Sequence, residues 1–354
     1  MQSSKITSKI VGHFGPTSST FRVFRDGLAE LYYQLKNSPA LEQRLLQWQR
    51  CLDLTHGNRI PNVNLFLQHT YLAVLARLVA YVELGFSPNP TEDHIGNILT
   101  GDFFSEYAGL QDFVEADVFS WPFLDSRVKH DSIMLVHDLL DDINSHAFVG
   151  LGEQILEDLY RRFEDTEVER STIAHPARER NNPDWSAERV LRVEMDLGSN
   201  PTASLLDPYC GTGNVLSVGL RIILQGLTNA GMDPRSILDH VLENVAGMDP
   251  HPLAVVIART KYVLALSDLL RQRGRLDVTI PVYLADASQP PKLTSPPVSA
   301  YSSTGIPSNP VARQYEIKNQ DPNDLSGGQD AYIITTDGTS TMLLIPHSLA
   351  INPV

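Results

Sequence analysis

The first 170 residues carry apolar side chains at the spacing of helices. In three segments the apolar positions recur every three or four residues, which places them along one face of a helix. These segments are residues 67–82, 133–143 and 155–163. Asp131 or Ser132 stands where a cap of the second helix is expected. Two aromatic-rich stretches, 101–104 and 118–121, are predicted to be loops that pack on the helices. We therefore predict a helical domain over residues 1–170.

The pattern changes near residue 170. A polar segment of mixed charge comes first, interrupted by Pro176 and Pro183. Short apolar runs then alternate with helical patterns. The predicted strands are residues 204–206, 245–248 and 278–284, and the predicted helices are residues 215–227 and 253–270. Such alternation is typical of a parallel sheet covered by helices. The fold class is thus α + α/β, with the α/β core over residues 171–288.

The last segment, residues 289–354, has a third character. Residues 289–330 are rich in Pro, Ser, Asn and Gly and are predicted to be a long loop. Two β-type runs, 331–336 and 341–345, flank an Asp337-Gly338 turn, which indicates a hairpin.

Composition narrows the function classes. Of the 354 residues, 28 are Lys or Arg and 42 are Asp or Glu, which gives a formal charge of −14. This balance argues against binding DNA or a membrane through net charge alone, although it leaves room for a local basic groove. The opening residues lack a hydrophobic signal core. Arg77 and Glu83 interrupt the most apolar stretch too soon for a membrane span. We predict a soluble, cytoplasmic protein that makes no membrane contact.

Metal-site and disulfide signatures are missing from the sequence. Cys51 and Cys210 are too few for a disulfide framework or a four-cysteine metal site. The histidines form no HExxH pair, and no cysteine lies at ligand spacing beside them. We therefore predict no metal ligands.

The most informative stretch is SLLDPYCGTGNVL, residues 204–216. A strand ends in Asp207-Pro208, and Gly211 and Gly213 then let the backbone turn into a helix whose free N–H groups can face a ligand. GTGNVL lacks the third glycine of the dinucleotide fingerprint, which disfavours a nucleotide-dependent oxidoreductase. GK[ST], the end of a phosphate-binding loop, occurs nowhere in the chain.

Acidic residues end the next two predicted strands. Asp249 follows the second strand, where a carboxylate can accept hydrogen bonds from ribose hydroxyls. Asp286 follows the third strand, where it can accept a hydrogen bond from an exocyclic amino group. With the glycine turn, these acids describe a pocket for an adenosine-containing ligand with little phosphate. The simpler alternative is that Asp249 and Asp286 cap helices or face solvent, and that Asp207 caps the glycine turn itself.

DPYCGTGNVL, AGMDPHPLAVVIAR and YLADAS resemble the first three cofactor motifs of S-adenosylmethionine-dependent adenine-specific DNA methyltransferases. The likeness is greatest to the large enzymes of restriction-modification and phage-defence systems. It implies an incomplete Rossmann-like methyltransferase sheet with S-adenosylmethionine as the cofactor. It also implies cofactor contacts by Asp207, Pro208, Gly211 and Gly213 near the methionine moiety, Asp249 on the ribose, Asp286 on the adenine, and Met248 and Pro250 beside the adenine ring.

The resemblance extends upstream. LFLQHTYLAVLARLVA, FVEADVFSW and ILEDLYRRF resemble the helical domain that precedes the catalytic domain in this family. The family then carries a GxYYTP motif that closes over the cofactor. Here the corresponding residues 179–185 keep Pro183, Asp184 and Trp185 but lack the two tyrosines and the threonine. Pro183 remains a candidate cofactor contact. The missing tyrosines and threonine bear on the affinity of the chain for the cofactor.

A larger departure concerns the chemistry. The family places an (Asn/Asp/Ser)-Pro-Pro-(aromatic) tetrapeptide after the fourth strand, where it holds the target amino group and stacks on a flipped base. The nearest match, SPPV at residues 295–298, has valine in the aromatic position, so we assign no catalytic residue. The resemblance implies that the chain stops before the catalytic strand and the target-recognition domain. The sheet would then have an open edge.

Two hypotheses follow from this departure. In the first, the chain is the N-terminal part of a DNA adenine methyltransferase and is inactive alone. It would then reach DNA through a missing C-terminal part or a partner subunit, such as a complementing methyltransferase half. In the second, it is a non-catalytic module that binds S-adenosylmethionine or a partner.

Overall fold

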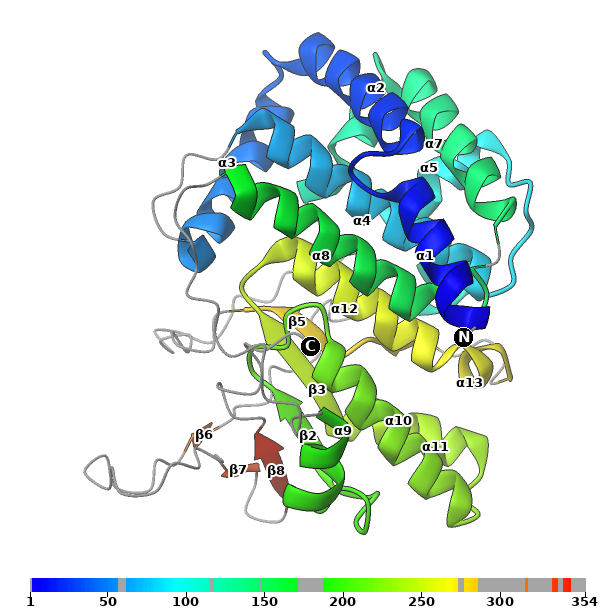
Figure 1. Ribbon diagram of the computed structural model, residues 1–354, viewed down its shortest axis with the longest axis vertical. Coiled ribbons are helices and arrows are strands. Elements are labelled where there is room, and N and C mark those ends of the chain that lie inside the picture. The colour runs from blue at the N-terminus through cyan, green and yellow to red at the C-terminus, as the bar shows by residue number, and fades with distance from the viewer. Residues whose placement is uncertain are drawn as a thin grey trace, which may run out of the picture.

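The computed structural model describes residues 2–56, 62–114, 118–146, 148–170, 187–272, 277–285, 316–317, 333–336 and 340–344. Its first part is helical (Figure 1). The elements are α1 (Gln2–Phe14), α2 (Ser19–Leu35), α3 (Pro39–His56), α4 (Val63–Glu83), α5 (Glu92–Thr100), α6 (Asp102–Tyr107), the 3₁₀-helix η1 (Val118–Phe123), α7 (Lys129–Asn144) and α8 (Gly152–Arg170). One short strand, β1 (Leu110–Gln111), lies between α6 and η1.

Helix α4 is the central helix of this part. It is apolar around nearly its whole circumference, and α2, α5, α7 and α8 pack against it, as does α12 (Pro252–Ala265) from the second part. Among the described residues, α4 is the one helix long and apolar enough to cross a membrane, but 89% of that stretch is buried inside the protein. Its apolar composition is therefore accounted for by its place in the core. The predicted helices over 67–82, 133–143 and 155–163 are confirmed as α4, α7 and α8.

Three local predictions in this part are wrong. Helix α7 begins at Lys129 with Val128 as its N-cap, so neither Asp131 nor Ser132 caps it. The Ser132 hydroxyl bonds instead to the carbonyl oxygens of Pro122 and Val128, each at 2.8 Å. The two aromatic-rich stretches are helical, as α6 and η1. Burial favours this outcome, because a helical turn satisfies backbone groups that a buried loop would leave unpaired.

The second part alternates helices with strands, as predicted. It consists of α9 (Ala187–Arg189), the π-helical turn η2 (Val190–Glu194), β2 (Ser204–Asp207), α10 (Asn214–Asn229), α11 (Pro234–Asn244), β3 (Val245–Asp249), α12, α13 (Ser267–Gln272), β4 (Val278–Thr279), β5 (Val282–Leu284), β6 (Glu316–Ile317), β7 (Ile333–Thr336) and β8 (Ser340–Leu344). The main sheet has the order β5-β3-β2-β8-β7-β6. Strands β5, β3, β2 and β8 are parallel, whereas β7 is antiparallel to both β8 and β6.

The predicted strand 278–284 is split in two. Strand β4 pairs with β1 from the helical part, and β5 pairs with β3 in the main sheet. Pro281 stands between them, and proline has no N–H to donate to a ladder. Its carbonyl oxygen accepts the N–H of Gly247 at 2.9 Å. The break thus lets one short segment join both parts of the molecule.

The predicted hairpin is present as β7 and β8, and it extends the same sheet. Leu205 of β2 is in register with Leu343 of β8. Strand β2 is therefore flanked on both sides by described strands, β3 and β8. The outer strands of the described sheet are β5 and β6.

The helical part and the strand-containing part share one hydrophobic core. In Figure 1 the helices of the first part lie above the strands, α10 and α11 lie beside the strands, and α8 and α12 run side by side between the two parts. Buried Arg259 on α12 donates from Nε to the carbonyl oxygen of Val282 at 2.7 Å and from Nη1 to that of Asp112 at 3.2 Å. The domain boundary near residue 170 stays a prediction, because residues 171–186 lie outside the described part of the chain.

Candidate functional site

The glycine turn after β2 requires glycine at two positions, Gly211 and Gly213. Gly211 has φ +52° and Gly213 has φ +78°, the left-handed region that disfavours side chains. A Cβ on Gly213 would also lie 3.1 Å from Cα of Ala258 on α12, whereas a Cβ on Gly211 would meet open space. The turn is fastened by the Cys210 N–H, which donates to the Met248 carbonyl oxygen at 3.0 Å. It brings the end of β2 next to the end of β3.

Asp207 ends β2 as a fully buried carboxyl group. Its Oδ1 accepts the N–H of Tyr209 at 3.3 Å, while its Oδ2 has no hydrogen-bond partner among the described residues. Burial, with a further contribution from nearby Asp249, raises the pKa of Asp207 from 3.8 to about 7. Leaving a buried carboxylate oxygen unpaired is costly, so such groups point to a ligand.

Asp249 ends β3 and is only 9% exposed. Its Oδ2 accepts the N–H of Gly211 at 2.9 Å, and its Oδ1 accepts the N–H of His251 at 2.8 Å. Burial raises its pKa, and these two N–H groups partly oppose the rise. The carboxylate therefore holds the glycine turn against the start of α12. Since each carboxylate oxygen can accept two hydrogen bonds, lone pairs remain for a ligand hydroxyl.

The structure brings together six of the predicted site residues at the carboxyl ends of β2 and β3. These are Asp207, Pro208, Gly211, Gly213, Met248 and Asp249. Pro208 and Met248 are half-buried. Asp286 lies outside the described residues, although the N–H of Ala285 donates to the Asp249 carbonyl oxygen at 3.1 Å. Pro183 and the SPPV stretch at 295–298 also lie outside them.

Sequence reasoning missed a buried polar cluster that links α8 to the glycine turn. Glu157 on α8 accepts the Thr212 hydroxyl at 2.6 Å and the Lys261 ammonium at 3.3 Å, both on Oε2. Lys261 on α12 also donates to the Asn214 side chain, at the first residue of α10. Glu157 is 4% and Lys261 is 3% exposed. Burial alone would raise the pKa of Glu157. The charge of Lys261 and the hydrogen bonds to the carboxylate outweigh burial, so the pKa of Glu157 is lowered and its carboxyl group is ionised at neutral pH.

A signal for this cluster exists in the sequence. Glu157 lies between the apolar residues Leu156 and Leu159, and Lys261 lies in a mainly apolar helix that also holds Arg259. A charge inside an apolar stripe is seldom buried without a partner. The signal does not identify that partner, because 104 positions separate Glu157 from Lys261.

One cavity lies beside the Asp249 turn. It measures about 20 Å³ and is lined by residues that include His69, Tyr160 and His251. This volume holds one water molecule but no cofactor.

A glycine turn and two acids at the carboxyl ends of adjacent parallel strands are typical of an α/β ligand-binding site. The chain is 28% identical over 141 residues to the adenine-specific methyltransferase PglX of Streptomyces coelicolor, an alignment that covers 39% of this chain and 12% of that protein. The chain thus spans about an eighth of the length of the relative that it matches. No family model matches it, and no solved structure does.

Proposed function

We propose that this chain forms the S-adenosylmethionine-binding, Rossmann-like part of an adenine-specific DNA methyltransferase of the large restriction-modification or phage-defence type. The observation that carries the proposal is the Oδ2 of buried Asp207, which has no partner among the described residues and lies beside two left-handed glycines. The ammonium group of a methionine moiety is a fitting partner for that oxygen. The three sequence motifs and the likeness to a methyltransferase support the same reading.

Each site residue then has a role in holding the cofactor. Asp207 would accept the ammonium group, and Gly211 and Gly213 would leave room for the methionine end. Asp249 would use its remaining lone pairs for the ribose hydroxyls. Asp286 would accept the adenine amino group, with Met248 beside the ring. When bound, S-adenosylmethionine would supply the methyl group for the exocyclic amino nitrogen of a flipped adenine in DNA.

We further propose that this chain alone does not methylate DNA. Its sequence holds no (Asn/Asp/Ser)-Pro-Pro-(aromatic) tetrapeptide, and its charge of −14 does not favour DNA binding by the chain as a whole. Contact with DNA would come from another part of the enzyme or from a partner subunit, in the cytoplasm. The second candidate function is a non-catalytic module that binds S-adenosylmethionine or a partner, and the same missing tetrapeptide favours it.

Calorimetric titration with S-adenosylmethionine tests the cofactor site. The native chain should bind S-adenosylmethionine. Asp207→Asn should weaken this binding at least about tenfold, because the neutral amide cannot form an ion pair with the ammonium group. Asp239→Asn is the matched control, since Asp239 is an exposed aspartate on α11 that pairs with Arg235. Absence of binding by the folded native chain, or equal affinity in Asp207→Asn, would contradict the proposal.

Transfer of labelled methyl groups to plasmid DNA tests the chemistry. We expect none from the purified chain, even where calorimetry shows cofactor binding. Transfer by this chain would overturn the proposed inactivity. If a complementing polypeptide with the tetrapeptide restores transfer, the split-enzyme reading is favoured over the non-catalytic module.

A further inference from the structure

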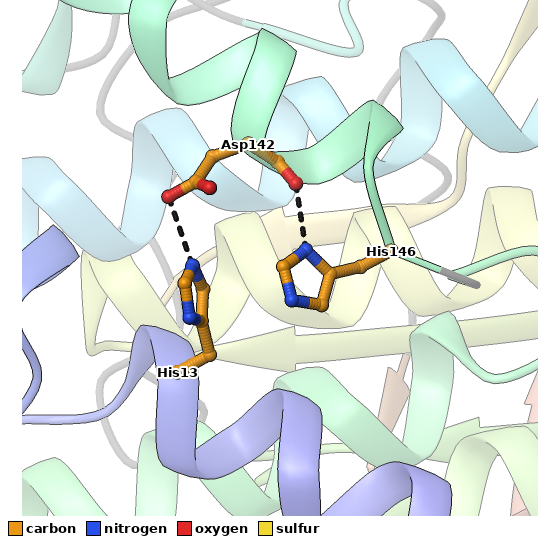
Figure 2. A group of neighbouring side chains, drawn as sticks. All are labelled: His13, Asp142 and His146. Atoms are coloured by element: carbon orange, nitrogen blue, oxygen red, sulfur yellow. Dashed lines mark hydrogen bonds and ion pairs between the residues drawn. The ribbon is translucent and has the colours of Figure 1, made fainter.

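A cluster of metal-ligating side chains joins the end of α1 to the end of α7. It consists of His13 on α1, Asp142 in the last turn of α7, and His146 just beyond that helix (Figure 2). One donor atom from each of the three residues lies within 4.8 Å of the others, and all three residues are half-buried. None of these residues belongs to the glycine-turn site.

The hydrogen bonds of His146 prepare one of its ring nitrogens to bind a cation. Nδ1 lies 2.8 Å from the backbone carbonyl oxygen of Asp142 and 2.9 Å from the Ser145 hydroxyl, which itself donates to that carbonyl at 2.7 Å. A carbonyl can only accept, so Nδ1 carries the proton and the neutral ring keeps its lone pair on Nε2. A ring N–H held by a backbone carbonyl is the usual arrangement of a metal-bound histidine. The ring of His146 lies 4.4 Å from that of His13.

The polar atoms of His13 and Asp142 converge in the same place. His13 Nε2 lies 3.0 Å from Asp142 Oδ2, and the Thr20 hydroxyl lies 2.8 Å from that oxygen and 3.1 Å from that nitrogen. In Figure 2 the imidazole of His13 points at the carboxylate, and that of His146 lies beside it. A cation can replace the proton shared by His13 and Asp142 while the Thr20 hydroxyl remains bound to the carboxylate.

We propose that His13, Asp142 and His146 bind a Zn²⁺ ion that fastens α1 to the end of α7. Two imidazoles and a carboxylate suit Zn²⁺, whereas Mg²⁺ and Ca²⁺ prefer oxygen ligands throughout. Zinc bonds of about 2.0–2.2 Å place tetrahedral ligands about 3.4 Å apart, so the three half-buried side chains move closer together when they hold the ion. Water fills the fourth position. Sequence patterns could not reveal this site, because 129 positions separate His13 from Asp142.

Calorimetric titration of the full, metal-stripped chain with Zn²⁺ at pH 7.5 tests the proposal. One ion should bind per chain. His13→Ala and His146→Ala should each weaken binding at least about tenfold, since even losing an outer-shell partner costs about 10- to 100-fold. His137→Ala is the matched control, because His137 also faces an aspartate on α7, Asp141 at 3.4 Å, but has no described third ligand. The control should bind Zn²⁺ as the native chain does, and Mg²⁺ should not bind in its place.

A second measurement separates a bound ion from a loss of fold. Zn²⁺ should raise the Tm of the native chain and of His137→Ala, but not that of His146→Ala. Where His13→Ala fails to fold, Asp142→Asn serves, since it keeps the size of the side chain and removes its charge. Absence of Zn²⁺ binding by the folded native chain would overturn the site. So would equal affinity in the folded native chain, His146→Ala and Asp142→Asn.

Discussion

Glu157 and Asp207 are buried carboxyl groups on two sides of the glycine turn, and their surroundings differ sharply. Glu157 has an ammonium, a hydroxyl and the Arg161 guanidinium, whose Nε lies 3.0 Å from Oε1. Asp207 has one backbone N–H and an oxygen without a described partner. The pKa of Glu157 is lowered and that of Asp207 is raised.

This difference separates a structural group from a candidate ligand-binding group. Glu157 connects α8 of the helical part to the residues that begin α10, so its charge is used within the fold. Asp207 bears a desolvation cost that the described structure does not offset, as expected where a ligand completes the site. The helical part thus holds the glycine turn through Glu157, and Asp207 at the end of β2 is left as the candidate ligand-binding group.

The largest effect should come from breaking the Glu157–Lys261 pair. Glu157→Ala leaves the Lys261 ammonium buried without its carboxylate, which should lower the free energy of unfolding by about 3–5 kcal/mol. Urea unfolding followed by circular dichroism measures the loss. Glu188→Ala is the control, since it removes an exposed Glu–Arg pair with Arg192 and should cost at most about 1 kcal/mol.

Replacing both partners sharpens this test. The double variant Glu157→Leu, Lys261→Met removes both charges and should recover most of the stability, because well-packed apolar residues often replace a buried ion pair at little cost. A double variant as unstable as Glu157→Ala would mean that the hydrogen bonds to Thr212 and Asn214, rather than the ion pair, hold the turn.

The next effect concerns the pH dependence caused by Asp207. Its pKa of about 7 in the folded chain lies above its ordinary value of 3.8, so the folded state holds the proton more tightly. This contribution to stability is complete below about pH 4, falls as the pH rises, and levels off above about pH 7. Between pH 5 and pH 8 the native chain should lose about 2–3 kcal/mol more than Asp207→Asn does.

Urea unfolding of both chains at the two pH values measures that difference. Saturating S-adenosylmethionine should reduce it, because an ammonium group beside Asp207 favours the ionised carboxylate. If the two chains respond to pH identically, Asp207 is ionised in the fold and has a partner outside the described residues.

Local patterns in the sequence predicted much of the fold and the front of the site. The helical period of 67–82 identified the core helix α4, and the two glycines identified the turn. Asp207 and Asp249 could be placed together because the carboxyl ends of adjacent parallel strands meet. These predictions needed only short-range periodicity and one general rule about sheets.

The features that the sequence could not predict depend on contacts between segments that are far apart along the chain. The sequence of residues 278–284 predicts one strand. In the structure β4 pairs with β1 from the helical part and β5 pairs with β3, and Pro281 stands between β4 and β5. Glu157 was missed because Thr212 comes from the glycine turn and Lys261 from α12, both far along the chain. Hydrophobic period carries no information about which distant segment meets a given residue.

The smallest effect compares the two glycines of the turn. Gly211→Ala meets only the left-handed backbone, which costs about 1–2 kcal/mol. Gly213→Ala meets the same cost plus a contact with Ala258 at 3.1 Å, so it should lose about 1 kcal/mol more. Thermal unfolding of the two variants measures the order. Ala258 lies on α12, so an equal loss of stability in both variants would show that α12 moves to accommodate the added methyl group. The contact between α12 and the glycine turn would then be less rigid than the Glu157–Lys261 pair implies.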